Sequence, residues 1–385
     1  MIPTEILRRV GRKAKRVLSP TGPIPAVDTT ATATGQPERA TNTTARPAVF
    51  DSYTLPGDLD SLGVLLMPLA EYHGRELGAV ADALTSLGHR CTFLVEQAQV
   101  EAIDKHLGTH PRILVDAQFD KYRLGSFDSF VAMNDWGEPS RAIYHLARVR
   151  GVPSFAKVEG VQDFMDVDTG RIRLPYLAAD HVLVQGSNDV AALDRKNLHV
   201  VGNANMETAW NEGPASIDRN GEVVINSNFT YGVLTEVRDD FLGQAIEAIV
   251  AVGLDPVISQ HPADRPLPGE FVQYRTERSM SSILPACEAV ITRFSTVPFE
   301  AIAYGTPFIY FNPHGEKVST FATSSPAFEH VRSVDALRSA LRAAGENRAS
   351  YRTRAESYFR DQIDMTTTHS AMRAAIAIGS VIDAE

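Results

Sequence analysis

The sequence contains few of the residues that mark a disulfide-stabilised or membrane-spanning protein. Its 385 residues include only two cysteines, Cys91 and Cys287, far apart in sequence, so neither a cysteine-based metal site nor a disulfide framework is expected. No apolar run approaches the roughly 20 residues needed to cross a bilayer. The first residues lack the uninterrupted apolar core of a signal peptide. These absences predict a protein of the reducing cytoplasm.

Positive charge is also scarce. The chain carries 37 Lys and Arg against 47 Asp and Glu, a formal net charge of -10. A general nucleic-acid binder needs a basic surface to displace counterions, so the composition argues against nucleic acid as a partner. A phosphate ligand has to be bound by a local site. The 44% hydrophobic content is sufficient for two domains, each with its own core.

Basic residues gather at the start of the chain. Residues 2 to 18 place apolar side chains at helical spacing, with Lys and Arg between them. This pattern predicts a basic amphipathic helix over residues 1–18 that lies on an anionic membrane surface. A solvated or domain-packing helix is the alternative. Residues 19–47, rich in Thr, Ala and Pro, predict a disordered tether, and together the two segments predict a peripheral protein at the inner face of the membrane.

Strand and helix patterns alternate from Leu62 onward, which predicts parallel sheets covered by helices on both faces. A stretch rich in Pro, Gly and Asn, residues 211–221, is the predicted hinge between two such series. We therefore expect an N-terminal Rossmann-like domain over residues 48–212 and a C-terminal one over residues 213–385. Within the second domain, one predicted strand covers residues 271–274.

The pattern of residues 289–312 predicts a strand, a tight loop, a short helix and a second strand. Ser295 and Thr296 lie where the helix begins, and Pro298 falls in its first turn, where its missing N–H costs nothing. Two hydroxyls, free amides and the positive end of a helix suit a phosphate. Glu300, about one turn further, is placed to accept hydrogen bonds from ribose hydroxyls. The alternative is that Ser295 and Thr296 only cap the helix.

A second predicted strand, residues 256–260, ends at the pair His261-Pro262. Parallel strands finish at the same edge of a sheet, which is where ligands bind in open α/β folds. We therefore expect His261 to reach the same phosphate or base as Ser295 and Thr296.

These elements together resemble the donor half of GT-B transferases. The nearest resemblance is to CDP-glycerol glycerophosphotransferases and to bacterial capsule or sialic-acid transferases, which pair a His-Pro element with a Ser-Ser or Ser-Thr loop. The run from Glu300 to Gly305-Thr306-Pro307 belongs to the same pattern, whereas Arg293 stands where the glycerophosphotransferases usually have Asp. The resemblance implies two Rossmann-like domains facing each other across a cleft. It also implies a last helix that crosses back onto the first domain.

A second resemblance is to the non-hydrolysing UDP-GlcNAc 2-epimerases, which share this two-domain architecture. It lies in residues 157–160, residues 174–187 and Val201-Gly-Asn, and the similarity as a whole covers residues 60–315. It implies that Asp135 and Glu159 are catalytic. Two departures count against epimerisation. The Pro-Glu-Glu element of that family is replaced here by Arg173-Leu-Pro-Tyr, and its His-Arg motif is replaced by the run from Asn226 to Thr230.

Residues that directly follow the first-domain strands are the candidates for catalysis. His73 comes after the first strand and suits proton abstraction from an acceptor hydroxyl near neutral pH. A capping or packing histidine is the alternative. Gly74 is expected to open the first helix and to let a ligand approach the backbone. We rank the candidate bases as His73, then Asp135, then Glu159.

No metal or cofactor is expected. The cluster Asp163, Asp166 and Asp168 lies in a Gly- and Asp-rich turn and is interpreted as a solvated loop. Positive side chains can neutralise a leaving diphosphate in place of a divalent ion, and the candidates are Arg293, Arg75 and Lys317.

The sequence thus predicts a membrane-associated GT-B transferase of cell-surface polysaccharide synthesis. It would move a glycosyl or polyol-phosphate group from a CDP-, CMP- or UDP-linked donor onto a glycan or lipid-linked acceptor. A UDP-GlcNAc 2-epimerase-like isomerase and a non-catalytic nucleotide-sugar-binding component of an assembly complex are the alternatives. The predicted catalytic residues are His73, Asp135 and Glu159, and the predicted donor-binding residues are Asn228, His261, Arg293, Ser295, Thr296 and Glu300.

Overall fold

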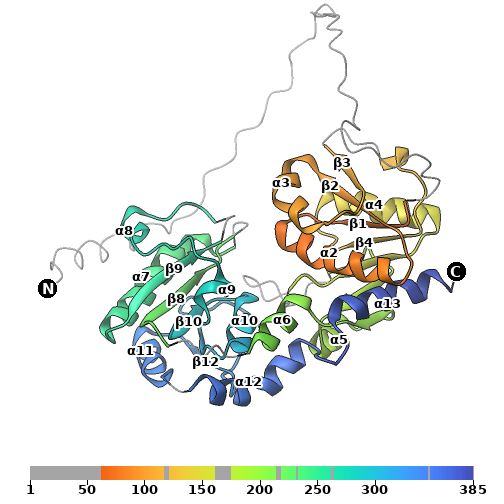
Figure 1. Ribbon diagram of the computed structural model, residues 1–385. Helices are drawn as coiled ribbons and strands as arrows, with labels where there is room; N and C mark the ends of the chain where they lie inside the picture. The colour runs from red at the N-terminus through yellow and green to blue at the C-terminus, as the bar shows by residue number, and fades with distance from the viewer. Residues whose placement is uncertain are drawn as a thin grey trace, which may run out of the picture. The chain divides into compact units, whose positions relative to one another are not determined.

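The computed structural model describes residues 62–116, 121–160, 175–213, 218–230, 233–261, 264–345 and 347–384. All of them belong to one compact unit, and their strands form two separate sheets (Figure 1). The predicted amphipathic helix (1–18), the predicted tether (19–47) and the aspartate cluster of residues 163–168 lie outside the described residues. The predicted hinge lies partly outside them, at residues 214–217.

The first sheet is built from the N-terminal strands. They are β1 (Val64–Met67), β2 (Cys91–Glu96), β3 (Arg112–Val115), β4 (Ser129–Ala132), β5 (Ser154–Lys157), β6 (His181–Val184) and β7 (Leu198–Val200). All pairs are parallel, in the order β3-β2-β1-β4-β5-β6-β7. The chain direction across the sheet therefore reverses between β1 and β4, which is the topological switch point where ligands bind in such folds.

Helices cover both faces of this sheet. They are α2 (Glu71–Ser86), α3 (Val100–Ile103), α4 (Glu138–Arg150) and α5 (Ser187–Leu193), with short 3-10 turns η2 (Gln97–Gln99), η3 (Asp104–His106) and η4 (Lys121–Arg123). The next helix, α6 (Ala204–Glu212), places Met206 and Ala209 in an apolar cluster of the second sheet. Alternate residues of a strand point to opposite faces. Val64 and Leu66 accordingly pack in a cluster with α2, whereas Leu65 and Met67 pack in a cluster with α4.

The second sheet has five parallel strands. They are β8 (Glu222–Ser227), β9 (Asp255–Gln260), β10 (Ala289–Thr292), β11 (Phe308–Phe311) and β12 (Phe328–Val331), in the order β12-β11-β10-β8-β9. Its helices are η5 (Thr235–Val237), α7 (Arg238–Ala251), α8 (Gly269–Val272), α9 (Met280–Ile283), α10 (Val297–Ala303), α11 (Val334–Ala343) and α12 (Arg348–Gln362). Val223 and Ile225 pack with α7 and α11, and Val224 packs with α10 and α12 on the other face.

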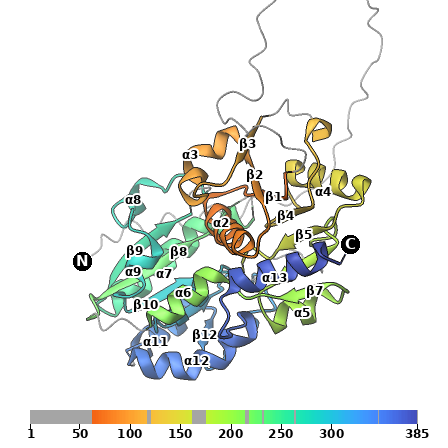
Figure 2. The same cartoon turned by 45° about the vertical axis from the view of Figure 1, so that its right-hand side comes forward.

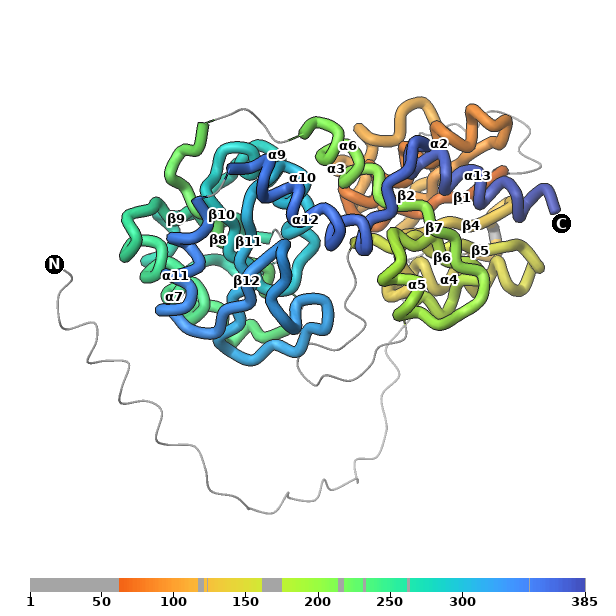
Figure 3. The backbone as a smooth tube through the Cα atoms, turned by 90° about the horizontal axis from the view of Figure 1, so that it is seen from below, coloured from red at the N-terminus to blue at the C-terminus, as the bar shows by residue number. Residues whose placement is uncertain are grey.

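The last helix, α13 (Ser370–Ile382), returns to the first sheet. The chain runs from α12 beside the second sheet into α13 (Figure 3), and Figures 1 and 2 both show α13 alongside α2. Ala374 and Ile378 are fully buried in one apolar cluster with Leu77 and Val80 of α2. The predicted crossing of the last helix onto the first domain is therefore confirmed.

Two local predictions are wrong. Residues 271–274 do not form a strand, because the chain makes the single helical turn α8 after Pro268, and the extended pairing with Ile258 begins only at the end of that stretch. Gly74 does not open α2, which begins at Glu71. Its missing side chain instead allows close packing, since a Cβ atom there would lie 3.1 Å from Ile103 Cγ2. Strands β3 and β12 were not predicted.

The architecture is α/β, with two parallel sheets each covered by helices on both faces, as the sequence predicts. Among the described residues, none of the helices is long and apolar enough to span a membrane.

Candidate functional site

The loop between β10 and α10 holds the two predicted phosphate-binding hydroxyls. Ser295 Oγ accepts a hydrogen bond from the Val297 N–H at 3.2 Å, so this hydroxyl stabilises the start of α10, as the capping alternative predicts. Thr296 makes no such cap, and its side chain is half-buried. The Thr296 hydroxyl is therefore the better placed of the two to meet a ligand.

The Arg293 side chain is engaged in contacts within the protein. Its guanidinium forms an ion pair with Glu316, and Nη1 donates to the backbone oxygens of Asn228 (2.9 Å) and Val233 (3.3 Å). It also lies 4.7 Å from the ring centre of Phe229, and the residue is only 6% exposed. These contacts hold the backbone at Asn228 and at Val233 close to the end of β10. The predicted role in neutralising a donor diphosphate is at odds with this geometry.

Asn228 and His261 both lie at the carboxyl edge of the second sheet. Asn228 Nδ2 donates to the Phe294 carbonyl at 3.3 Å, which ties the end of β8 to the Ser295–Thr296 loop. The His261 N–H donates to the Ser227 carbonyl at 3.0 Å. Burial lowers the pKa of His261 below its usual 6.5, although the nearby Asp264 carboxylate opposes the shift. The imidazole is therefore neutral near pH 7 and can donate or accept a hydrogen bond.

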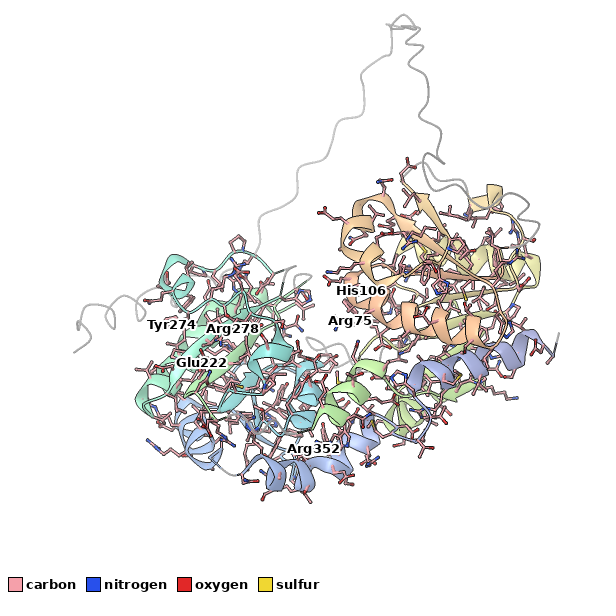
Figure 4. All side chains as sticks on the ribbon, in the orientation of Figure 1. Arg75, His106, Glu222, Tyr274, Arg278 and Arg352 are labelled. Carbon is pink, nitrogen blue, oxygen red and sulfur yellow. The ribbon has the colours of Figure 1, made fainter. Side chains whose placement is uncertain are left out.

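Glu300 lies in α10, four residues beyond Thr296, and is half-buried. Burial raises the pKa of its carboxyl to about 7, with the positive charge of Arg75 acting in the opposite direction. Arg75 belongs to α2 of the first sheet (Figure 4) and is exposed. Arg75 of α2 therefore lies near enough to α10 for its charge to act on the Glu300 carboxyl.

His73, Glu159 and Asn134 form a hydrogen-bonded group at the carboxyl edge of the first sheet. Glu159 Oε2 lies 2.9 Å from His73 Nε2 and 2.8 Å from Asn134 Nδ2. His73 Nδ1 accepts the Leu69 N–H at 3.1 Å, so this nitrogen carries no proton and the ring proton lies on Nε2, pointing at Glu159. His73 is 2% exposed, against 15% for Glu159. Both ring nitrogens of His73 are thus engaged, and Glu159 is the more accessible group.

Asp135 has a different environment. Its two carboxylate oxygens accept hydrogen bonds from the backbone N–H groups of Tyr176 (3.1 Å) and Ala178 (2.9 Å), and the residue is 6% exposed. These bonds anchor the turn that precedes β6. The structure therefore does not place Asp135 with His73 and Glu159 as a third proton-transfer group.

The two sheet edges meet at Gly160, the residue after Glu159. A Cβ atom built at Gly160 would overlap Thr296 Oγ1, so any larger residue there would have to displace the Thr296 hydroxyl. This contact places the carboxylate of Glu159 one residue away from the loop that follows β10. The candidate site therefore combines the hydrogen-bonded residues His73, Glu159 and Asn134 with Thr296, Glu300 and Arg75.

A buried charge cluster behind Glu159 was not predicted. Lys157 Nζ lies 3.0 Å from Glu76 Oε2, and the two side chains are 0% and 2% exposed. Burial raises the pKa of the nearby Asp189 to about 7, while hydrogen bonds to its carboxylate and the charge of Lys157 lower it. In the sequence Lys157 is one residue of a predicted strand, and no local pattern there indicates a buried ion pair. Asn134 lies just after β4, and no local pattern in the sequence links it to Glu159.

In the described part of the chain, no group of three or more His, Cys, Asp or Glu side chains is arranged to hold a metal ion. The candidate site is instead built from one carboxylate with its two polar neighbours, a threonine loop and a second carboxyl group.

No protein-family model and no curated protein matches this sequence. Solved structures do match it. The glycotransferase of kitacinnamycin superposes with a TM-score of 0.54 at 12% identity, covering 83% of this chain and 98% of its own. A structure named as a UDP-N-acetylglucosamine 2-epimerase from Listeria monocytogenes gives a TM-score of 0.55 at 11% identity, over 84% and 96% of the two chains.

A third match is the wall teichoic acid polymerase TagF soaked with CDPG, with a TM-score of 0.54 at 10% identity over 84% of this chain and 89% of that one. The chain has the GT-B fold. The resemblance to GT-B transferases and to the epimerases that share their architecture is confirmed at the level of this fold. Identities of 10 to 12% do not transfer an activity or a substrate.

Proposed function

We propose that this GT-B protein is a transferase that moves a group from a nucleotide-activated donor to an acceptor hydroxyl, with Glu159 as the general base. The position of Glu159 carries the proposal. Its Oε2 is held by His73 and Asn134, whereas its Oε1 makes no hydrogen bond to any described residue. The neighbouring Gly160 lies against Thr296. A carboxylate oriented by two donors and left with one open oxygen is suited to accept a proton from a bound hydroxyl.

In the proposed step, Glu159 Oε1 takes the proton of the acceptor hydroxyl while the hydroxyl oxygen bonds to the transferred group. The bond from that group to the donor phosphate breaks, and the nucleotide leaves with the electron pair. His73 orients Glu159 and does not itself take the proton, because its Nδ1 already accepts the Leu69 N–H. This reverses the order of candidate bases derived from the sequence.

The donor is proposed to bind at the edge of the second sheet. Thr296 and the amides of its loop would contact the phosphates, and Glu300 would accept hydrogen bonds from the ribose. Since Arg293 is committed to Glu316, the exposed Arg75 is the better candidate to offset the charge of the leaving diphosphate. His261 and Asn228 remain proposed donor contacts at the same edge.

A more specific assignment is a CDP-, CMP- or UDP-linked donor and a glycan or lipid-linked acceptor of cell-surface polysaccharide synthesis. The His261-Pro262 element and the Ser295–Thr296 loop, which resemble those of CDP-glycerol glycerophosphotransferases, motivate a CDP-linked donor among these. The basic amphipathic pattern of residues 2 to 18 supports a peripheral position on an anionic membrane. No additional cofactor is required by this chemistry.

An epimerase is the second candidate, because a structure named as a UDP-N-acetylglucosamine 2-epimerase shares the fold. Epimerisation needs groups that exchange protons on both sides of the sugar. The engagement of both Asp135 oxygens by backbone amides leaves one fewer group for that task, and this favours the transferase.

Nucleotide binding and solvent exchange test the proposal together. CDP, CMP and UDP are each added to the full-length protein, and the melting temperature is recorded. Ligand present at 100 times its Kd stabilises the native state by about 2.7 kcal/mol. We expect stabilisation by at least one of the cytidine nucleotides, and no deuterium at C2 of UDP-GlcNAc after incubation in heavy water. Deuterium at C2 would establish the epimerase instead, and no stabilisation by any nucleotide would remove both candidates.

A further inference from the structure

A cavity of about 560 Å³ lies in the first-sheet half of the chain, between α4 and the turn before β6. This volume is within the range of small-molecule sites. Its lining includes Trp136 from the β4–α4 connection, Leu177 from the turn, and Arg141, His145 and Arg148 from α4. It is separate from the donor loop of the second sheet, and none of the roles proposed above uses it.

Three basic side chains follow one side of this cavity. Arg141, His145 and Arg148 are spaced four and then three residues apart, which places them on one face of α4, and all three are exposed. Arg141 Nε donates to the Asp135 carbonyl at 2.6 Å, and Arg148 Nη2 donates to the Ala178 carbonyl at 3.1 Å. Each guanidinium is therefore held in place while keeping N–H donors that meet no acceptor among the described residues.

An aromatic surface adjoins these side chains. Trp136 is 40% exposed and stacks on the buried Tyr176, with ring centres 6.4 Å apart and planes inclined by 29°. Tyr176 has φ of 61°, a left-handed conformation that is rare for a bulky residue. Its N–H donates to Asp135, and this bond helps to hold the strained turn against the tryptophan. Strain of this kind is retained where the surrounding structure enforces it, often at ligand sites.

The cavity is connected to the proposed base by two hydrogen bonds. The backbone N–H of Trp136 donates to Asn134 Oδ1 at 3.2 Å, and Asn134 Nδ2 donates to Glu159 Oε2 at 2.8 Å. A ligand that contacts Trp136 therefore lies close to the carboxylate that would activate an acceptor hydroxyl. Among the described lining residues, Asp135 alone carries a carboxylate, and both of its oxygens are bonded to backbone amides, which reduces its repulsion of an anion.

We propose that this cavity binds a phosphate-bearing sugar of the acceptor. The sugar ring packs on Trp136, and Arg141 and Arg148 hold the phosphate, since guanidinium groups match phosphate geometry. A chain with a net charge of -10 does not attract anions in general, so this local basic row supplies the selectivity. The inference rests on the proposed function for its biological meaning, because the ligand is taken to be part of the acceptor.

The test measures binding of N-acetylglucosamine 1-phosphate and of uncharged N-acetylglucosamine by calorimetry on the full-length protein. Arg141→Gln with Arg148→Gln is the main variant. Arg90→Gln with Lys196→Gln is the matched control, which removes two charges from exposed side chains outside the cavity lining. Binding of CDP and UDP is measured on every variant.

We expect the wild type and the control to bind the sugar phosphate equally, the main variant to bind it at least tenfold more weakly, and the uncharged sugar to bind more weakly than its phosphate. Nucleotide affinity should be the same in all three proteins. His145→Glu provides a second variant with no bonds to lose in the described structure, and it should also weaken the sugar phosphate at least tenfold.

The inference is overturned if the main variant and His145→Glu both bind the sugar phosphate as the wild type does. It is also overturned if CDP or UDP competes with the sugar phosphate and loses affinity in the main variant, since the cavity would then be a nucleotide site. Failure of every nucleotide to bind, with the sugar phosphate still bound through Arg141 and Arg148, would count against the proposed transferase and leave this site in place.

Discussion

Each sheet carries a group of buried charges beneath its carboxyl edge, and the two groups differ in how completely they are bonded. Under the second sheet, Glu316 accepts hydrogen bonds from Arg293, the Phe294 N–H and the Tyr310 hydroxyl, and Arg293 uses its other donors on backbone carbonyls. Under the first sheet, Lys157 and Glu76 form a close pair whose facing atoms have no further hydrogen-bond partner among the described residues.

The difference shows how burial alone misleads about function. In the second group, Arg293 and Glu316 bond the Asn228 carbonyl and the Phe294 N–H, so this buried pair stabilises the loops around it. At the edge of the first sheet, in contrast, Glu159 Oε1 has no hydrogen bond to any described residue, and burial raises the pKa of Asp189 to about 7. The proposed function thus rests on unused bonding capacity and not on charge as such. Three predictions test the distinction, from the largest effect to the smallest.

The largest effect is expected for Glu159→Gln. The amide keeps the size of the side chain but cannot accept a proton, and removal of a general base lowers turnover by about 10² to 10⁴. Nucleotide affinity should stay close to wild type, because Glu159 belongs to the first sheet. Steady-state turnover with a competent donor and acceptor measures the first quantity, and calorimetry measures the second.

Glu138→Gln, which removes an exposed carboxylate from the start of α4, is the matched control and should keep full activity. Equal turnover of Glu159→Gln and wild type would move the base to another residue.

Next in size is Arg293→Met. Removing one partner of a buried ion pair leaves an uncompensated charge, so the free energy of unfolding should fall by about 3 kcal/mol. Urea denaturation followed by circular dichroism measures the loss. Adding Glu316→Leu should recover much of it, since the stranded carboxylate is then gone. A variant with unchanged stability and weakened nucleotide binding would restore the donor role first predicted for Arg293.

The smallest effect is the pH dependence caused by Asp189. Its pKa is 3.8 when unperturbed and about 7 in the folded protein. Between these values the folded state holds a proton that the unfolded state releases, so the free energy of unfolding falls as the pH rises. One such group contributes at most about 1.4 kcal/mol per pH unit.

Asp189→Asn should therefore show a flatter decline than wild type between roughly pH 5 and pH 7 in urea denaturation. Asp194→Asn, at an exposed position near the end of the same helix, should decline as the wild type does. Parallel curves for wild type and Asp189→Asn would show that the buried carboxylate does not titrate in this range.

Most of the fold was predictable because its signals are local. Apolar runs such as those of β1 and β10 mark buried parallel strands, and the short loop after β10 is readable from Ser295, Thr296 and Pro298 alone. The errors also have local causes. Residues 271–274 contain apolar side chains at strand-like spacing, but Pro268 starts a helical turn there. Strands β3 and β12 are as short as β1 and β10 but contain polar residues that are not buried, Arg112 in β3 and Glu329 and His330 in β12, so no unbroken apolar run marks them.

The sequence by itself determined the α/β class, the parallel sheets and the list of side chains that follow the strands. The resemblance to GT-B transferases added the return of the last helix to the first domain. Only the tertiary structure decided what those side chains do. The hydrogen bond that orients Glu159 comes from His73, 86 residues away, and whether Arg293 meets a ligand depends on Glu316, 23 residues away. Packing between segments distant in sequence determines these partners. A charged side chain is available for chemistry only where its partners leave some of its hydrogen-bonding atoms without a bond.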